Sequence, residues 1–148
     1  MAILCKNHPN VEFILDTKHT NPKFYMTQYN IIRDAFEKLE LELNQLTPQF
    51  YNIEMAKKIL KEFRFLNSIY TLYMQMLNQK QLLKEIAENK DIKGITISKK
   101  RYLKNPILIK KIRQLDKEIN VHTIFNEEEL NLFIDEKVEG IYTDIKKI

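Results

Sequence analysis

The chain is poor in several residues that common architectures and binding sites require. Its 148 residues include one cysteine, two glycines and no tryptophan. The single Cys5 excludes a disulfide framework within the chain and is compatible with a reducing compartment. Gly94 and Gly140 are too few to build a glycine-rich phosphate loop of the dinucleotide-binding or P-loop type. An open nucleotide-binding sheet would therefore lack its usual phosphate-binding chemistry.

Long apolar segments and concentrated charge are also lacking. No apolar run approaches the ~20 residues of a membrane span, and residues 1–6 lack the basic-then-apolar order of a signal peptide. We therefore expect a cytoplasmic protein. The 24 basic and 20 acidic residues give a net charge of +4 and are spread through the sequence, which is typical of a solvated surface. No basic stripe carries interleaved aromatic residues, so nucleic-acid binding is not expected.

The sequence does contain a strict alternation of strand and helix patterns. Segments rich in apolar, β-branched or aromatic residues predict strands at residues 11–18, 45–51, 67–74, 91–98, 121–125 and 141–144. Segments with apolar residues at helical spacing predict helices at residues 26–41, 53–63, 78–88, 106–119 and 126–137. Six strands alternating with five helices indicate an α/β protein with a parallel sheet. Either an open doubly wound sheet or part of a barrel satisfies this pattern.

The clearest single pattern is the βαβ unit predicted at residues 121–144. Asn126 stands at the expected N-cap, and three glutamates follow it in the first helical turn. An asparagine cap and early negative charge both satisfy the free N–H groups at a helix start. Glu129 stands where a capping box places the acid that reaches back. Leu130 and Phe133 fall on one face, which gives this helix a side to bury.

Several segments resemble those of the glycerophosphodiester phosphodiesterase family. They are the ring residue and threonine at 122–123 before the capped acidic helix, VEGIYTD at 138–144, ILDTK at 14–18, PQFYN at 48–52 and IYTLY at 69–73. The family belongs with the phosphatidylinositol-phospholipase-C-like phosphodiesterases, which are (β/α)8 barrels. Since a complete barrel takes about 250 residues, the resemblance implies a partial TIM-type barrel that covers strands three to eight. Residues 1–148 would then form one incomplete (β/α) barrel domain without the first two βα units.

The resemblance also implies a cation and phosphate site on the first predicted strand. By this resemblance, Asp16 would help to hold a divalent cation, Mg²⁺ or Ca²⁺, and Lys18 would face the substrate phosphate. A carboxylate suits a hard cation, and a lysine is a mobile charge suited to phosphate. The two residues share parity at the carboxyl end of their strand, so their side chains point to the same side. A surface salt bridge is the alternative reading of the same spacing.

Further candidates would lie on the same rim of the barrel. The residues that could bind a polyol head group or attract a phosphodiester are Gln49, Tyr51, Tyr73 and the cations at 99–101. His122 stands where the family carries an aromatic wall of the substrate cavity, although a packed or solvated ring would explain it too. The spacing from Thr123 to Asn126 is one residue longer than in the family, which predicts a bulge at this strand end.

The acid–base residues of the family are not present in this sequence. The family uses two histidines, one of them in a His-Arg motif, whereas this chain has only His8, His19 and His122 and no His-Arg dipeptide. We therefore expect a phosphoric diester hydrolase-like protein of lipid metabolism that is truncated and inactive alone. Its expected ligand is a small phosphodiester or a phospholipid head group. The alternative is a non-catalytic α/β module that associates with another chain, or with itself, through open sheet edges.

Overall fold

A computed structural model describes residues 1–17, 21–72 and 79–145 of the chain. The chain divides into two compact units, Met1–Tyr70 and Thr71–Ile148. The strands follow the order β1-β2-β3-β4-β5-β6, and the registers of β1 with β2, β2 with β3, β4 with β5 and β5 with β6 are all parallel. The α/β class predicted from the alternation and the partial TIM-type (β/α) architecture implied by the family resemblance are confirmed. In the described part of the chain, no helix is both long and apolar enough to cross a membrane.

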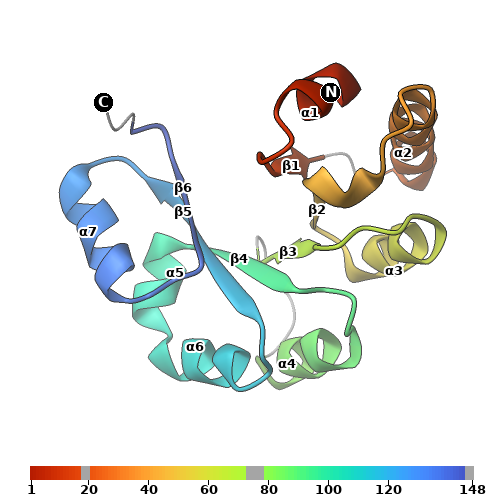
Figure 1. Ribbon diagram of the computed structural model, residues 1–148. Helices are drawn as coiled ribbons and strands as arrows, with labels where there is room; N and C mark the ends of the chain where they lie inside the picture. The colour runs from red at the N-terminus through yellow and green to blue at the C-terminus, as the bar shows by residue number, and fades with distance from the viewer. Residues whose placement is uncertain (18–20, 73–78, 146–148) are drawn as a thin grey trace. The chain divides into compact units, whose positions relative to one another are not determined.

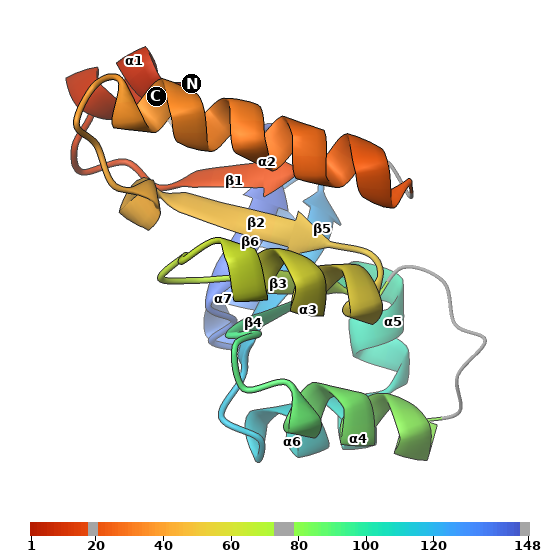
Figure 2. The same ribbon diagram turned by 90° about the vertical axis from the view of Figure 1, so that its right-hand side faces the viewer.

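The first unit is built from three parallel strands and the helices that connect them (Figures 1 and 2). Its elements are α1 (Ala2–Asn7), β1 (Phe13–Asp16), α2 (Pro22–Glu37), the short 3-10 helix η1 (Leu43–Gln45), β2 (Leu46–Phe50), α3 (Ile53–Glu62) and β3 (Ile69–Thr71), whose last residue belongs to the second unit. In Figure 2, α2 runs beside β1 and α3 beside β2. Asn52 caps α3, as its sequence position predicts, because its Oδ1 accepts from the Met55 N–H at 3.1 Å.

The core of the first unit is apolar and strongly aromatic. Leu46 and Phe50 of β2 are fully buried, as is Ile59 of α3. Tyr29 of α2 packs against Phe63, with ring centroids 5.7 Å apart. Burying such large side chains supplies most of the free energy that holds helices on a sheet.

The second unit repeats this arrangement around β4 and β5. Its further elements are α4 (Gln79–Glu88), β4 (Gly94–Ser98), α5 (Lys99–Lys104), α6 (Pro106–Arg113), β5 (Glu118–Ile124), α7 (Glu127–Asp135) and β6 (Gly140–Thr143). Asn126 caps α7 as predicted, accepting from the Glu129 N–H at 2.9 Å. Glu129 in turn reaches back to accept from the Phe125 N–H at 3.2 Å.

The two faces of β4 and β5 differ in chemistry. Isoleucine and valine at one parity, including Ile95, Ile97 and Val121, are completely buried. The other parity carries Thr96 and Asn120, which are polar and also buried. Alternate residues of a strand point to opposite faces, so the second unit has one apolar face and one polar face.

Several element boundaries differ from the sequence-based expectation. The region between β4 and β5 holds two helices, and α1 precedes β1, so the described residues contain seven α-helices where five were expected. The helix expected to reach residue 119 ends at Arg113, because Asp116 adopts a left-handed backbone with φ of 55°. Glu40 and Lys137, which follow α2 and α7, have the same φ. The predicted bulge is present as a register shift between Val121 and Ile124.

Candidate functional site

Three polar side chains meet at the carboxyl ends of β1 and β2 in the first unit. Asp16 ends β1 and is aligned with Gln49 of β2. Tyr51 follows β2, and its Oη donates to Asp16 Oδ1 at 2.6 Å. Gln49 Nε2 lies 3.0 Å from Tyr51 Oη and 3.5 Å from the same Asp16 oxygen. Asp16, Gln49 and Tyr51, all three predicted from the sequence as candidates on this rim, are therefore neighbours, and the Tyr51 hydroxyl orients the Asp16 carboxylate.

The surroundings of this carboxylate also include the start of α2. Tyr25 is buried, and its Oη donates to the Thr17 carbonyl oxygen. Burial, and then the negative charge of Asp16, raise the pKa of Tyr25 to about 12. Tyr25 therefore stays a neutral hydrogen-bond donor at physiological pH. The cluster presents one oriented, solvent-exposed carboxylate at the edge where (β/α) barrels build their active sites.

The residues of the cluster do not form a complete cation site. Mg²⁺ and Ca²⁺ take six or more oxygen ligands, usually with several carboxylates or carbonyls. The described ranges contain no group of three His, Cys, Asp or Glu side chains that could hold a metal ion. Asp16 by itself does not fit the expected cation. Lys18 and Tyr73 lie outside the described residues, so their phosphate-binding and polyol-binding roles stay predictions.

In the second unit, His122 packs beside another ring. Its centroid lies 6.4 Å from that of Tyr142, with the planes inclined by 45°. His122 is half-buried in β5 and is aligned with Ser98 of β4. The bulge of β5 lies between Val121 and Ile124 and so includes His122. The polar face of the second unit thus carries an imidazole and a phenol near the carboxyl ends of its strands.

The three cations at 99–101 begin helix α5, and two of them are engaged within the second unit. Lys99 Nζ lies 2.5 Å from Glu129 Oε1 and 5.0 Å from the centre of the exposed Phe125 ring. Arg101 Nη1 donates to the Leu72 carbonyl at 3.2 Å. Hydrogen bonding from Lys99, and then from the Phe125 N–H, lowers the pKa of Glu129.

This ion pair weakens the case for a free phosphate-attracting cluster, because the charge of Lys99 is already compensated. Sequence reasoning assigned Glu129 only a capping role, and Lys99 lies 30 positions away from it. No local pattern signals a pair at that separation. Lys100 is the exposed member of the cation cluster.

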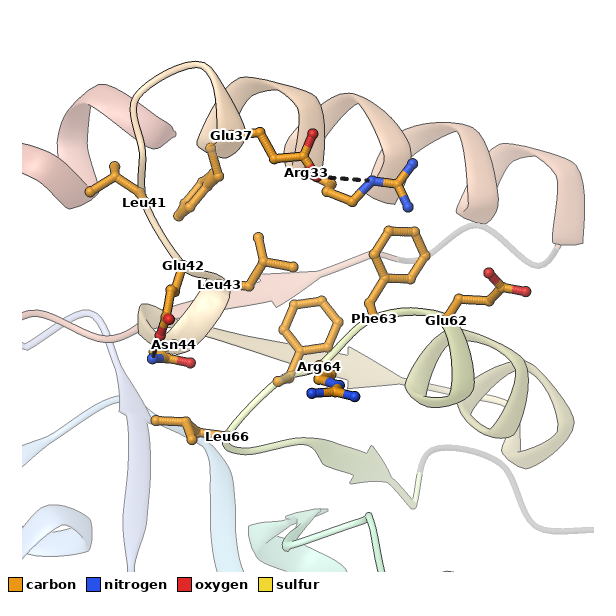
Figure 3. A pocket seen from close by; sticks show the side chains of 12 residues that line it. Arg33, Glu37, Leu41, Glu42, Leu43, Asn44, Glu62, Phe63, Arg64 and Leu66 are labelled. Atoms are coloured by element: carbon orange, nitrogen blue, oxygen red, sulfur yellow. Dashed lines mark hydrogen bonds and ion pairs between the residues drawn. The ribbon is translucent and has the colours of Figure 1, made fainter.

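A pocket of about 580 Å³ lies elsewhere in the first unit (Figure 3). Phe36, Leu43 and Phe63 contribute apolar walls. On its rim, the Arg33 guanidinium lies 5.3 Å from the centre of the Phe63 ring and 3.8 Å from Glu37 Oε1. The lining segments at residues 41–44 and 62–66, which include the start of η1 and the last residue of α3, precede the amino ends of β2 and β3. The pocket is therefore distinct from the Asp16 cluster at the carboxyl ends.

The fold defines the class of protein, an α/β protein built as part of a (β/α) barrel. No protein-family model matches the chain, and no curated protein matches it in sequence. Solved structures do match. A glycerophosphodiester phosphodiesterase from Parabacteroides distasonis ATCC 8503 aligns with a TM-score of 0.73 at 17% identity, over 97% of this chain and 57% of that chain. A proposed glycerophosphoryl diester phosphodiesterase from Silicibacter pomeroyi DSS-3 aligns with a TM-score of 0.64 at 11% identity, over 97% and 50%.

The resemblance predicted from the sequence is thereby confirmed at the level of fold. The chain is similar in structure to glycerophosphodiester phosphodiesterases and spans about half the length of the solved proteins that it matches. At these identities the likeness shows the fold, because one barrel architecture supports many chemistries.

Proposed function

We propose that this chain is a phosphoric diester hydrolase-like protein of the glycerophosphodiester phosphodiesterase type, which binds glycerophosphodiesters of lipid metabolism. The observation that carries the proposal is the structural match over 97% of the chain to a solved glycerophosphodiester phosphodiesterase. The Asp16 cluster supports it, because the carboxylate lies at the strand ends where barrel enzymes bind substrate.

In this proposal the binding roles are divided among a few side chains. Lys18 would supply positive charge to the phosphodiester, while Gln49 and Tyr73 would hydrogen-bond the polyol. His122 would form part of the cavity wall through its packing with Tyr142. A divalent cation would bind here only with ligands in addition to Asp16.

The chain by itself is proposed to be inactive. General acid–base cleavage requires proton-transfer groups within hydrogen-bond reach of the substrate. The sequence has three histidines and no His-Arg motif. His8 directly follows α1 in the first unit. His122 lies in β5 of the second unit and packs on Tyr142 of β6, so the two described histidines belong to different units.

Activity and binding should be measured separately. The purified chain is incubated with glycerophosphocholine and Mg²⁺ or Ca²⁺, and release of glycerol 3-phosphate is followed; we expect none above buffer. Robust metal-dependent turnover would overturn the proposed inactivity. Binding of glycerophosphocholine in the presence of Mg²⁺ or Ca²⁺ is followed by NMR shift changes, which Asp16→Asn should weaken because it removes the carboxylate proposed to help hold the cation. Asp34→Asn, at an exposed aspartate of α2 in the same unit, is the matched control and should leave binding unchanged. No binding by the wild-type chain would contradict the proposal.

A second candidate is a non-catalytic module that associates through its sheet edges. Strand β1 is at one end of the strand order, and Ile14 in its middle is 43% exposed. An apolar edge strand is a template for pairing with another chain. Sedimentation over a range of concentrations should then reveal self-association that Ile14→Lys reduces. A monodisperse monomer at every concentration would exclude self-association.

A further inference from the structure

A row of buried polar side chains crosses the polar face of the second unit. Thr71, Thr96 and Asn120 belong to β3, β4 and β5 and are 3%, 0% and 7% exposed. Thr96 is aligned with Asn120. The Leu72 N–H donates to the Thr96 carbonyl at 2.8 Å, which places Thr71 beside Thr96 in a parallel ladder. The three side chains therefore occupy one layer on three neighbouring strands.

Each member of this row has a buried polar atom without a protein hydrogen-bond partner. These atoms are Thr71 Oγ1, Thr96 Oγ1 and Asn120 Nδ2. Buried polar atoms in proteins are nearly always paired, either with protein or with ordered water, because an unpaired group is destabilising. Three such atoms in adjacent positions call for hydrogen-bonding ligands that bridge one to the next.

The spacing of the strands constrains the size of the molecule that can bridge these atoms. Neighbouring strands lie about 4.8 Å apart, and these three atoms form no hydrogen bond with one another across that gap. A water molecule about 2.8 Å from each of two groups spans that separation. No member of the row is charged, so an ion is not favoured. The atoms are closed to solvent, which excludes a larger polyol.

The donors and acceptors of the row also match water. Asn120 Nδ2 can only donate, whereas each threonine hydroxyl both donates and accepts. A Cβ built on Gly140 would lie 2.0 Å from Asn120 Oδ1, so the amide oxygen lies against Gly140 of β6. The amide nitrogen is the atom left for the row. A water can accept from this nitrogen and donate to Thr96.

We propose that this row holds two internal water molecules. One bridges Asn120 Nδ2 and Thr96 Oγ1, and the other bridges Thr96 Oγ1 and Thr71 Oγ1. Ser98 and His122 form the next aligned pair toward the carboxyl ends of β4 and β5. The two waters are therefore a fixed hydrated layer directly beneath the predicted His122 wall, and their presence does not depend on the proposed hydrolase function.

The sign of one substitution distinguishes a hydrated row from a dry one. Thr96→Val keeps the side-chain shape and removes the hydroxyl. If waters bridge the row, this change breaks two hydrogen bonds, and the urea midpoint should fall. If the row is dry, the change removes an unpaired polar atom, and the midpoint should rise, which would overturn the proposal. Thr143→Val is the matched reference, because the Thr143 hydroxyl donates to the Ile124 carbonyl at 2.9 Å and its loss should lower the midpoint.

A measurement on the unaltered chain covers the case in which Thr96→Val does not fold. Long-lived internal water gives cross-relaxation peaks at the water frequency in NMR spectra. We expect such peaks at the Asn120 side-chain amide of the wild-type protein. Exposed asparagine amides, which should show only exchange with bulk solvent, are the control. The absence of cross-relaxation peaks at the Asn120 amide would overturn the proposal.

Discussion

Replacing Gly140 by alanine should destabilise the protein through a single steric contact. Gly140 is the first residue of β6, and its φ is not in the left-handed region, so its backbone conformation is open to alanine. The new Cβ would lie 2.0 Å from Asn120 Oδ1 and 3.0 Å from Asn120 Cγ. These are well below van der Waals separations, and Asn120 is buried. The asparagine side chain must therefore move within a packed interior.

The magnitude follows from two opposing effects. Forcing an extra carbon into a packed site costs about 1–3 kcal/mol. The lower conformational entropy of alanine in the unfolded chain returns roughly 0.4–1 kcal/mol. We therefore expect a net loss of about 1–2 kcal/mol for Gly140→Ala in the wild-type background. With Asn120→Ala already present, only the Cβ of residue 120 remains nearby, at the ordinary contact distance of 3.6 Å.

The assay is a double-mutant cycle by urea denaturation, followed by far-ultraviolet circular dichroism. In the Asn120→Ala background, Gly140→Ala should be neutral or stabilising by up to about 1 kcal/mol. The coupling between the two positions should therefore be at least about 1 kcal/mol, with m-values unchanged across the four proteins. Equal costs in both backgrounds would refute the steric explanation.

Three further predictions follow from titratable groups and backbone geometry. Because the pKa of Glu129 is lowered, its pair with Lys99 stabilises the fold above the ordinary glutamate pKa of 4.5, and this stabilisation is lost as pH falls through the lower folded pKa. Glu129→Gln should therefore flatten the acid side of a plot of urea midpoint against pH, and an unchanged slope would contradict the pairing. Tyr25 should titrate near pH 12 by ultraviolet absorbance, and the free energy of unfolding should fall as pH rises from 10 to 12. The difference between wild type and Tyr25→Phe isolates this group. A pKa near 10 would count against its burial. Lys137→Gly should raise the free energy of unfolding by about 1 kcal/mol, and with it the urea midpoint, because a side chain at φ of 55° is strained. A lower midpoint would show that no strain is present.

The order and type of the elements could be predicted because their signals are local. The caps at Asn52 and Asn126 bond to groups within three residues, and the predicted positions proved correct. The helix ends were less predictable. The left-handed residues after α2 and α6 are Glu40 and Asp116, with no glycine to mark the stop. The bulge in β5 was predicted by comparison with the family spacing and is present.

The sequence by itself determined the strand–helix alternation and the α/β class, because side-chain periodicity and capping act within a few residues of the chain, and the barrel-type fold followed from its resemblance to a known family. It also placed Asp16 and Gln49 at strand ends. Only the tertiary structure decided which polar groups meet. The parallel register of β1 and β2 brings Tyr51 onto Asp16, and packing of α7 beside α5 brings Glu129 to Lys99. Such contacts join residues about 30 positions apart, and their hydrogen bonds depend on strand register and helix packing that no local pattern encodes.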